Sequence, residues 1–193
     1  MIPTFNASLV LPPYMGETPT ARAAMSPYKV TMLDVVERFA TNEQRVNILC
    51  GLLQYREALR NSGLTSGFQW LDGSFVEDVE NIRKRPPKDI DIVTFSAVPG
   101  ATNQDKRTWL NSHIDLIDPK KTKETYKCDA YLVDLSKEPN LIVDDTRYWF
   151  GLFSHQRETT LWKGMIQVPL WSNDDLAMEN LGEDWPNKGE NNA

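Results

Sequence analysis

Residues 70–95 read WLDGSFVEDVENIRKRPPKDIDIVTF, and this stretch decides the fold. It predicts one apolar strand over residues 68–71 that stops at Gly-Ser, and a second over residues 89–95 that opens with two aspartates one residue apart. Because side chains alternate between the faces of a strand, Asp89 and Asp91 point the same way, with their Cα atoms roughly 6.5 Å apart. Half-buried carboxylates at that spacing repel each other, so the pattern favours a cation held between them.

The composition is that of one globular domain. The chain has 193 residues, 40% hydrophobic and 25% charged, which is enough for a single core and argues against wholesale disorder. Five of the twelve prolines fall within residues 1–30, which we expect to form an extended N-terminal arm. Residues 31–180 are expected to form the domain, and residues 181–193 a flexible tail. No apolar stretch approaches the roughly 18 residues of a membrane span, so we expect a cytoplasmic protein.

Two helices are expected before the quoted stretch. Residues 32–39 have an apolar stripe at helical spacing. A longer helix is expected to follow, because Thr41 and Gln44 have capping-box spacing and Gly63 is a stop signal. The apolar positions assigned to the two helices are Met32, Val35, Val36, Phe39, Val46, Leu49, Leu53 and Leu59.

Further elements are expected after the quoted stretch. The pattern predicts a helix over residues 103–116 and a third strand over residues 126–135. Residues 147–170 alternate enough to predict a C-terminal β-hairpin with its turn near residues 157–159, and one short helix is expected within residues 173–185. The predicted fold class is therefore α+β, with a short mixed sheet, helices packed on one face, and the hairpin.

Gly73 and Ser74 stand where the first strand ends and a short helix is expected to begin. Glycine permits close backbone approach, and a helix N-terminus offers free N–H groups to an anion, to which Ser74 can add a hydroxyl donor. A phosphate cradle beside paired carboxylates is what a metal-bound nucleoside triphosphate requires. A simple Gly-Ser turn beside a solvent-exposed or calcium-binding aspartate pair is the alternative.

Two-metal phosphoryl transfer requires a further carboxylate, and the third strand offers Asp129 and Asp134. They differ in parity, so only one can join the site, and we choose Asp129 because Asp134 lies where the strand ends. Cys50 and Cys128 are not clustered with either histidine, so any metal is expected to have oxygen ligands, which favours Mg²⁺ or Mn²⁺.

A basic run lies between the Gly-Ser pair and the aspartates, although the chain as a whole carries a net charge of −6. A solvated surface loop is the simpler interpretation of such a run. Its position next to the predicted metal site instead favours phosphate contact, with Arg85 and Lys88 as candidates. The run consists of Arg83, Lys84, Arg85 and Lys88.

These residues resemble the polymerase-β-type nucleotidyltransferase superfamily, whose core pattern is Gly-Ser, an Asp-x-Asp strand and a later strand with a third aspartate. A closer resemblance is to a group of small, largely uncharacterised bacterial and phage nucleotidyltransferase-domain proteins. It rests on the segments MIPTFNASLVLPP, QWLDGSFVED, DIDIVTF, KCDAYLV and WKGM. The resemblance implies a polymerase-β-like core in which Asp89, Asp91 and Asp129 are catalytic and bind magnesium. Gly73 and Ser74 then hold the triphosphate.

Arg157 and Lys163 also fall at places similar to those of the family and are candidate phosphate contacts. Surface charge on a hairpin is an equal alternative for both. One spacing differs from the family pattern: fourteen residues separate Ser74 from Asp89, and the additional ones form the basic segment NIRKRPPK.

The resemblance implies a function as well. It is the transfer of a nucleoside monophosphate from an NTP or dNTP to a hydroxyl group of a nucleic acid, nucleotide or protein, with release of pyrophosphate. Small members of the superfamily serve in anti-phage defence or pair with a toxin, which implies a partner protein encoded nearby. The alternative function is a catalytically silent nucleotide-binding module that acts as an antitoxin or regulatory partner. A metal-dependent nuclease or phosphatase is disfavoured, because hydrolysis does not require a triphosphate cradle.

Overall fold

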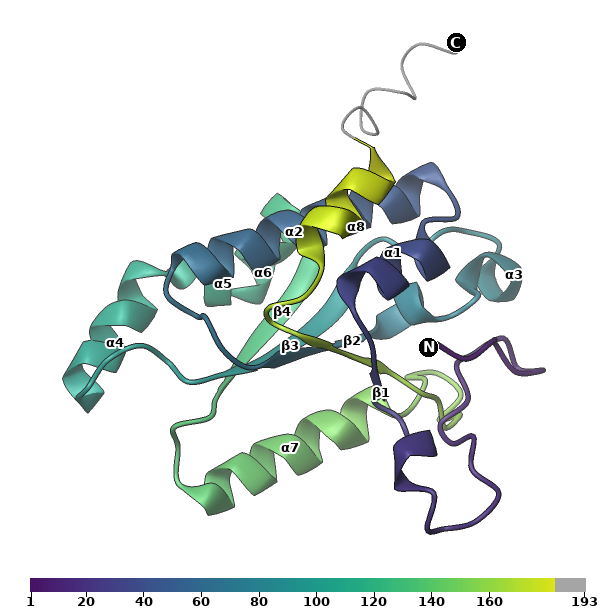
Figure 1. Ribbon diagram of the computed structural model, residues 1–193, viewed down its shortest axis with the longest axis horizontal. Helices are drawn as coiled ribbons and strands as arrows, with labels where there is room; N and C mark the ends of the chain where they lie inside the picture. Colours follow the sequence, from purple (N-terminus) through teal and green to yellow (C-terminus); the bar gives the residue numbers. More distant parts are fainter. Residues whose placement is uncertain (183–193) are drawn as a thin grey trace.

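The computed structural model describes residues 1–182, which form an α+β domain on one open five-stranded sheet (Figure 1). The strands are β1 Tyr28–Lys29, β2 Phe68–Asp72, β3 Ile90–Ser96, β4 Cys128–Asp134 and β5 Ile166–Pro169. Their order across the sheet is β1-β5-β2-β3-β4. β1 is parallel to β5 and β3 to β4, whereas β2 is antiparallel to both of its neighbours. The predicted mixed α+β class is confirmed, and the three predicted strands are β2, β3 and β4.

The N-terminal arm contributes a strand to this sheet, because β1 lies within residues 1–30 and pairs with β5. Further hydrogen bonds fasten the arm to the body of the domain. The Gly164 amide donates to the Leu11 carbonyl at 2.7 Å, and the Asp78 amide donates to the Leu9 carbonyl at 2.9 Å. Part of the arm is thus integrated into the domain.

Eight α-helices surround the sheet within the described residues. They are α1 Met32–Phe39, α2 Glu43–Asn61, α3 Val79–Arg83, α4 Asn103–Ser112, α5 Ile114–Ile117, α6 Pro119–Tyr126, α7 Pro139–Phe153 and α8 Asp174–Leu181. Two short 3-10 turns, η1 Arg22–Ala24 and η2 Gly73–Val76, complete the elements. The helix predicted over residues 103–116 is divided into α4 and α5 at His113, and α6 was not predicted.

The predicted capping box at the start of the second helix is wrong. Asn42, not Thr41, is the N-cap of α2, and its side chain accepts a hydrogen bond from the Arg45 amide at 3.0 Å. Asparagine is among the most favourable N-cap residues, so it takes precedence over the threonine before it. A capping box does form at α1, between Thr31 and Asp34.

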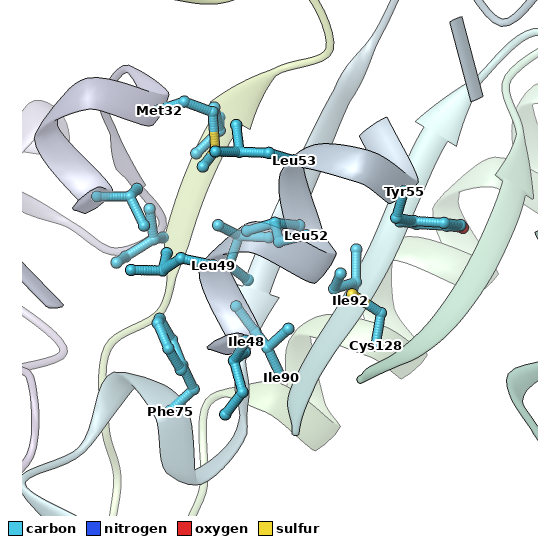
Figure 2. Close-up of a cluster of buried hydrophobic side chains, with 14 of the residues drawn as sticks. Met32, Ile48, Leu49, Leu52, Leu53, Tyr55, Phe75, Ile90, Ile92 and Cys128 are labelled. Atoms are coloured by element: carbon cyan, nitrogen blue, oxygen red, sulfur yellow. The ribbon is translucent and has the colours of Figure 1, made fainter. Parts of the chain in front are cut away.

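The main core lies between α2 and one face of the sheet, as Figure 2 shows. Side chains of α2 face the alternate residues of β3 and β4 that point away from the aspartates, namely Ile90, Ile92 and Cys128. All eight apolar positions predicted for the first two helices are buried. Each fully buried leucine or isoleucine contributes about 1.5–3 kcal/mol, so this layer dominates the stability of the domain.

The opposite face of the sheet is covered by α7, so the prediction of helices on one face only is wrong (Figure 1). Val93 and Phe95 share the face of Asp91, and such apolar side chains require a cover. The buried residues of this second cluster are Trp70, Val93, Phe95, Val133, Phe153 and Met165. The same sheet face is thus apolar along most of its length and acidic at one end.

The C-terminal β-hairpin predicted over residues 147–170 is also wrong. The chain up to Phe153 belongs to α7, which begins with proline, a common first helical residue. Beyond α7, the extended segments are β5 and a single isolated bridge between His155 and Trp162. The four-residue spacing of Trp149 and Phe153 was the helical signal, and the apparent alternation around it concealed the helix.

The described chain ends in α8, which confirms the short helix predicted within residues 173–185. Apart from its first two residues, the predicted flexible tail, residues 181–193, lies outside the described residues. No helix among residues 1–182 is long and apolar enough to cross a membrane. The cytoplasmic location stays a prediction.

Replacing Gly51 by alanine is expected to destabilise the protein by about 1–3 kcal/mol through overpacking. A Cβ atom on Gly51 of α2 would lie 2.1 Å from the Tyr126 carbonyl oxygen at the end of α6. The matched control is Gly151→Ala in α7, where a Cβ would meet no heavy atom within 4 Å. That change is expected to stabilise the helix by about 0.5–1 kcal/mol. Urea unfolding of both variants checks the pair, and an unchanged midpoint for Gly51→Ala would contradict the close packing of α2 on α6.

Candidate active site

Three aspartates lie side by side across three strands. The register of β2 and β3 pairs Asp72 with Asp91, and the register of β3 and β4 pairs Asp91 with Asp129. Because neighbouring strands are about 4.8 Å apart, these residues form a row at one end of the sheet. Asp89 immediately precedes β3 and lines the same cavity. The structure therefore brings together the three predicted catalytic aspartates and adds Asp72 to them.

The row opens into a cavity of about 560 Å³. Its walls come from the turn after β2, the loop after α3, the second half of α7 and the segment that follows α7. The charged and polar residues around the aspartates include Ser74, Glu77, Arg83, Arg85, Lys123, Gln156, Arg157 and Lys163. The aromatic residues are Tyr131, Tyr148, Trp149 and Phe153. Acidic, basic and aromatic groups thus share one concave site, which is typical of a binding site for a charged ligand with an apolar part.

Asp91, at the centre of the row, is the carboxylate with the least charge compensation. Within residues 1–182, no lysine or arginine nitrogen lies within 4.0 Å of its oxygens. Burial, together with the negative charges of Asp89 and Asp129, raises the pKa of Asp91 to about 6. A cation that enters the site would therefore be attracted to it.

Lys123 lies between two of the other aspartates. Its Nζ atom is 2.6 Å from Asp89 Oδ2 and 3.5 Å from Asp129 Oδ2. The hydrogen bond to Asp89 raises the pKa of Lys123, so the side chain is cationic. Half of the side chain is exposed, which leaves it free to withdraw towards solvent. Lys123 thus places one positive charge between two predicted metal ligands.

Lys163, a predicted phosphate contact, is buried in ion pairs and 2% exposed. Its Nζ atom lies 2.8 Å from Asp72 Oδ1 and 3.2 Å from Glu77 Oε1, and it donates to the Gly73 carbonyl at 3.3 Å. Desolvation lowers the pKa of Lys163, but Asp72 and Glu77 outweigh it and raise the pKa overall. Gln156 donates to the second oxygen of Glu77 at 2.9 Å. Through these contacts, Lys163 holds the turn after β2 in place.

Gly73 is required by the close approach of this turn to the acidic row. Its φ is +79°, and a Cβ atom would lie 2.5 Å from Asp91 Oδ2. Ser74 follows it and lines the cavity. The predicted short helix is here only the four-residue 3-10 turn η2. Gly73 and Ser74 therefore border the carboxylates as predicted, without an α-helix N-terminus.

The predicted basic residues divide into two groups. Arg83, Arg85 and Arg157 line the cavity. Arg83 lies 3.7 Å from Glu158, and Arg157 is close enough to Asp91 to oppose the rise in its pKa. Lys88 is exposed and does not line the cavity. Three arginines are thus available to a phosphate in the cavity, and Lys88 is not placed to join them.

The chemistry of the carboxylates fits a hard divalent cation. Asp89, Asp91 and Asp129 offer oxygen ligands only, which Mg²⁺ and Mn²⁺ prefer. As the side chains stand, no group of three or more His, Cys, Asp or Glu residues among residues 1–182 is arranged to hold one metal ion. The ammonium group of Lys123 instead lies between two of them. A metal would therefore have to displace Lys123.

Sequence reasoning missed several charged residues of the site, among them Asp72 and Lys123. Asp72 could have been found, because it ends the strand before Gly73 and shares the parity of Trp70. Lys123 gives no local signal, because the turn from α6 into β4 alone brings it back to Asp89. The choice of Asp129 over Asp134 agrees with the structure, since Asp134 pairs with Ser96 at the far end of β4.

Replacing Lys163 by methionine is expected to destabilise the protein by about 3–5 kcal/mol, because it leaves two buried carboxylates without their partner. Lys121→Met is the matched control, since Lys121 pairs with Asp115 on the exposed surface and such pairs contribute about 0–1 kcal/mol. Chemical denaturation of both variants measures the difference. Equal stabilities would show that Lys163 does not hold the turn and would restore it as a candidate phosphate ligand.

Comparison with known proteins identifies a family, but the function of that family is unknown. No curated protein and no solved structure shows significant similarity to the chain. Residues 3–169 match the family described as a family of unknown function, DUF6932. The matched segment contains every residue of the site, from Asp72 to Lys163, and most of the chain. The protein therefore belongs to the DUF6932 family.

Proposed function

We propose that this protein is a metal-dependent nucleotidyltransferase with a polymerase-β-like core. It transfers a nucleoside monophosphate from an NTP or dNTP to an acceptor hydroxyl and releases pyrophosphate. The observation that carries the proposal is the convergence of Asp89, Asp91 and Asp129 beside the close turn at Gly73. A carboxylate cluster for metal and an adjoining turn that admits a phosphate are what this reaction requires.

Asp89, Asp91 and Asp129 would hold Mg²⁺, or Mn²⁺ in its place. Divalent metal would supply charge stabilisation for the triphosphate and would lower the pKa of the acceptor hydroxyl. Gly73 lets the turn lie directly against Asp91, and Ser74 adds a hydroxyl donor that lines the cavity. The residues of the chain thus bind and orient the two reactants.

The transfer step forms one bond and breaks one bond. The acceptor oxygen forms a bond to the α-phosphorus, and the bond from that phosphorus to the pyrophosphate oxygen breaks. The proton of the acceptor hydroxyl passes to Asp129 or to solvent. Arg83, Arg85 and Arg157, which line the cavity, would bind the negative charge of the departing pyrophosphate.

A catalytically silent nucleotide-binding module is the second candidate. The position of Lys123 favours it, because a lysine between two carboxylates can replace a metal in a protein that only binds nucleotide. The exposure of Lys123 argues the other way, since a permanent structural partner would be buried, as Lys163 is. The two candidates differ in whether metal enters the site.

Replacing Asp91 by asparagine is expected to reduce the rate of transfer more than about 100-fold. Mutating a residue that only hydrogen-bonds to a metal ligand already lowers metal affinity or activity about 10- to 100-fold. The melting temperature should stay the same or rise, because the change removes a buried carboxylate that lacks an ion-pair partner. The assay uses each α-labelled NTP and dNTP with Mg²⁺, alone and with cell RNA or lysate, resolved on a denaturing gel. Asp115→Asn is the control on the surface. Undiminished transfer by Asp91→Asn would overturn the proposed catalytic site.

Replacing Lys123 by alanine is expected to strengthen Mn²⁺ binding about tenfold, because a charge that competes for the same carboxylates is removed. Calorimetric titration of the nucleotide-free protein measures this, with Lys121→Ala on the same helix as the control. Weaker or unchanged Mn²⁺ binding by Lys123→Ala would show that the carboxylates do not form the metal site, and would favour the silent module.

A further inference from the structure

An aromatic wall, formed by Tyr131, Tyr148 and Trp149, borders the acidic row. The ring centroids of Tyr131 and Trp149 are 4.6 Å apart, and those of Tyr148 and Trp149 are 5.1 Å apart. Tyr131 comes from β4 and the other two from α7, and all three line the cavity that holds the aspartates. Aromatic rings thus form one side of the site.

The aromatic wall lies on the far side of the aspartates from Gly73. Gly73 approaches Asp91 on β3, and Asp129 is one strand further away, on β4. Tyr131 is two residues after Asp129 and therefore on the same face. The order across the site is therefore turn, carboxylates, aromatic wall.

The core of the protein accounts for part of this wall but not for Tyr148. Tyr131 and Trp149 pack against the second core cluster, whereas Tyr148 is 58% exposed. Gly151, also in the lining of the cavity, has no heavy atom within 4 Å of where a Cβ would stand, so the space beside the rings is open. An exposed tyrosine beside open space in a polar cavity is suited to contact with a flat ligand.

We propose that the acceptor of the reaction is itself a nucleotide, free or at the end of a single strand, whose base stacks on the exposed ring of Tyr148. The inference rests on the proposed function and names the acceptor class of the same site. The turn at Gly73 lies against Asp91, and the aromatic wall borders Asp129 on the next strand. A base held by the wall therefore places its own sugar hydroxyl next to Asp129, the side on which the acceptor oxygen attacks the α-phosphorus.

The chemistry of the wall agrees with this acceptor. Arg83, Arg85 and Arg157 are assigned to the pyrophosphate, so the acceptor is recognised through its base. Base-aromatic stacking tolerates every base, so the wall suits an acceptor end of varied sequence. An unmodified protein hydroxyl offers no base to this wall.

Fluorescence anisotropy of the full chain with a labelled single-stranded RNA pentamer tests the inference, with an abasic strand of the same length for comparison. The wild-type protein is expected to bind the abasic strand about tenfold more weakly, since stacking of one base is worth about that factor or more. Tyr148→Ala should lose about tenfold in affinity for the RNA, and Tyr148→Phe, which keeps the ring, should not. Trp171→Ala is the control, because Trp171 is 62% exposed but lies against Arg60 of α2, away from the cavity.

Competition separates the two sources of the nucleotide. If a mononucleotide at equal concentration of bases displaces the pentamer, the acceptor is a free nucleotide. If the mononucleotide does not displace the pentamer, the acceptor is the end of a strand. Equal binding of RNA and abasic strand, or an unchanged affinity for Tyr148→Ala, would overturn the inference. Label transferred to a protein band in an Asp91-dependent way would also overturn it while leaving the proposed function intact. RNA binding that depends on Tyr148, without any transfer of label, would support the base-binding wall and overturn the transferase.

Discussion

The register of β2, β3 and β4 places Asp72, Asp91 and Asp129 directly beside one another. The other charged groups of the site offset the repulsion between these three carboxylates. Like charges opposite each other destabilise a sheet, so each carboxylate requires compensation. Buried Lys163 supplies it for Asp72, and half-exposed Lys123 supplies it for Asp129. Asp91 is left without an ion-pair partner among residues 1–182. Buried Lys163 fixes the turn after β2, and half-exposed Lys123 lies where we propose that a metal enters.

The two faces of the sheet explain how one domain carries both a core and an acidic site. On the α2 face, β3 and β4 begin with apolar residues and end with polar ones, Thr94, Ser96 and Asp134. On the α7 face, each strand begins with an acidic residue, Asp91 or Asp129, and continues with apolar ones. α7 covers the apolar part of that face. Its second half carries Tyr148 and Trp149, which belong to the aromatic wall beside the acidic end of the sheet. The same helix therefore completes the core and shapes the cavity.

Local patterns in the sequence predicted the parts of the structure that depend on neighbours along the chain. Alternation identified β2, β3 and β4 and placed Asp89 and Asp91 on one face, and the position of Asp134 at the end of its strand favoured Asp129. The partners of the charges could not be predicted, because Lys163 reaches Asp72 from 91 residues away in the sequence. The apolar residues within residues 147–153 fit both a strand pattern and a helix pattern. The helix forms because it covers the apolar face of β3, which is a tertiary contact that the local sequence does not show.

Anomalous diffraction from crystals grown with Mn²⁺ and a non-hydrolysable nucleoside triphosphate would show whether the aspartates hold a metal. We expect a manganese peak between Asp89, Asp91 and Asp129, with Lys123 withdrawn and the triphosphate beside Gly73 and Ser74. A structure with nucleotide bound, no manganese at the aspartates and Lys123 still between Asp89 and Asp129 would contradict this expectation. The protein would then be a nucleotide-binding module whose lysine has taken the place of the metal.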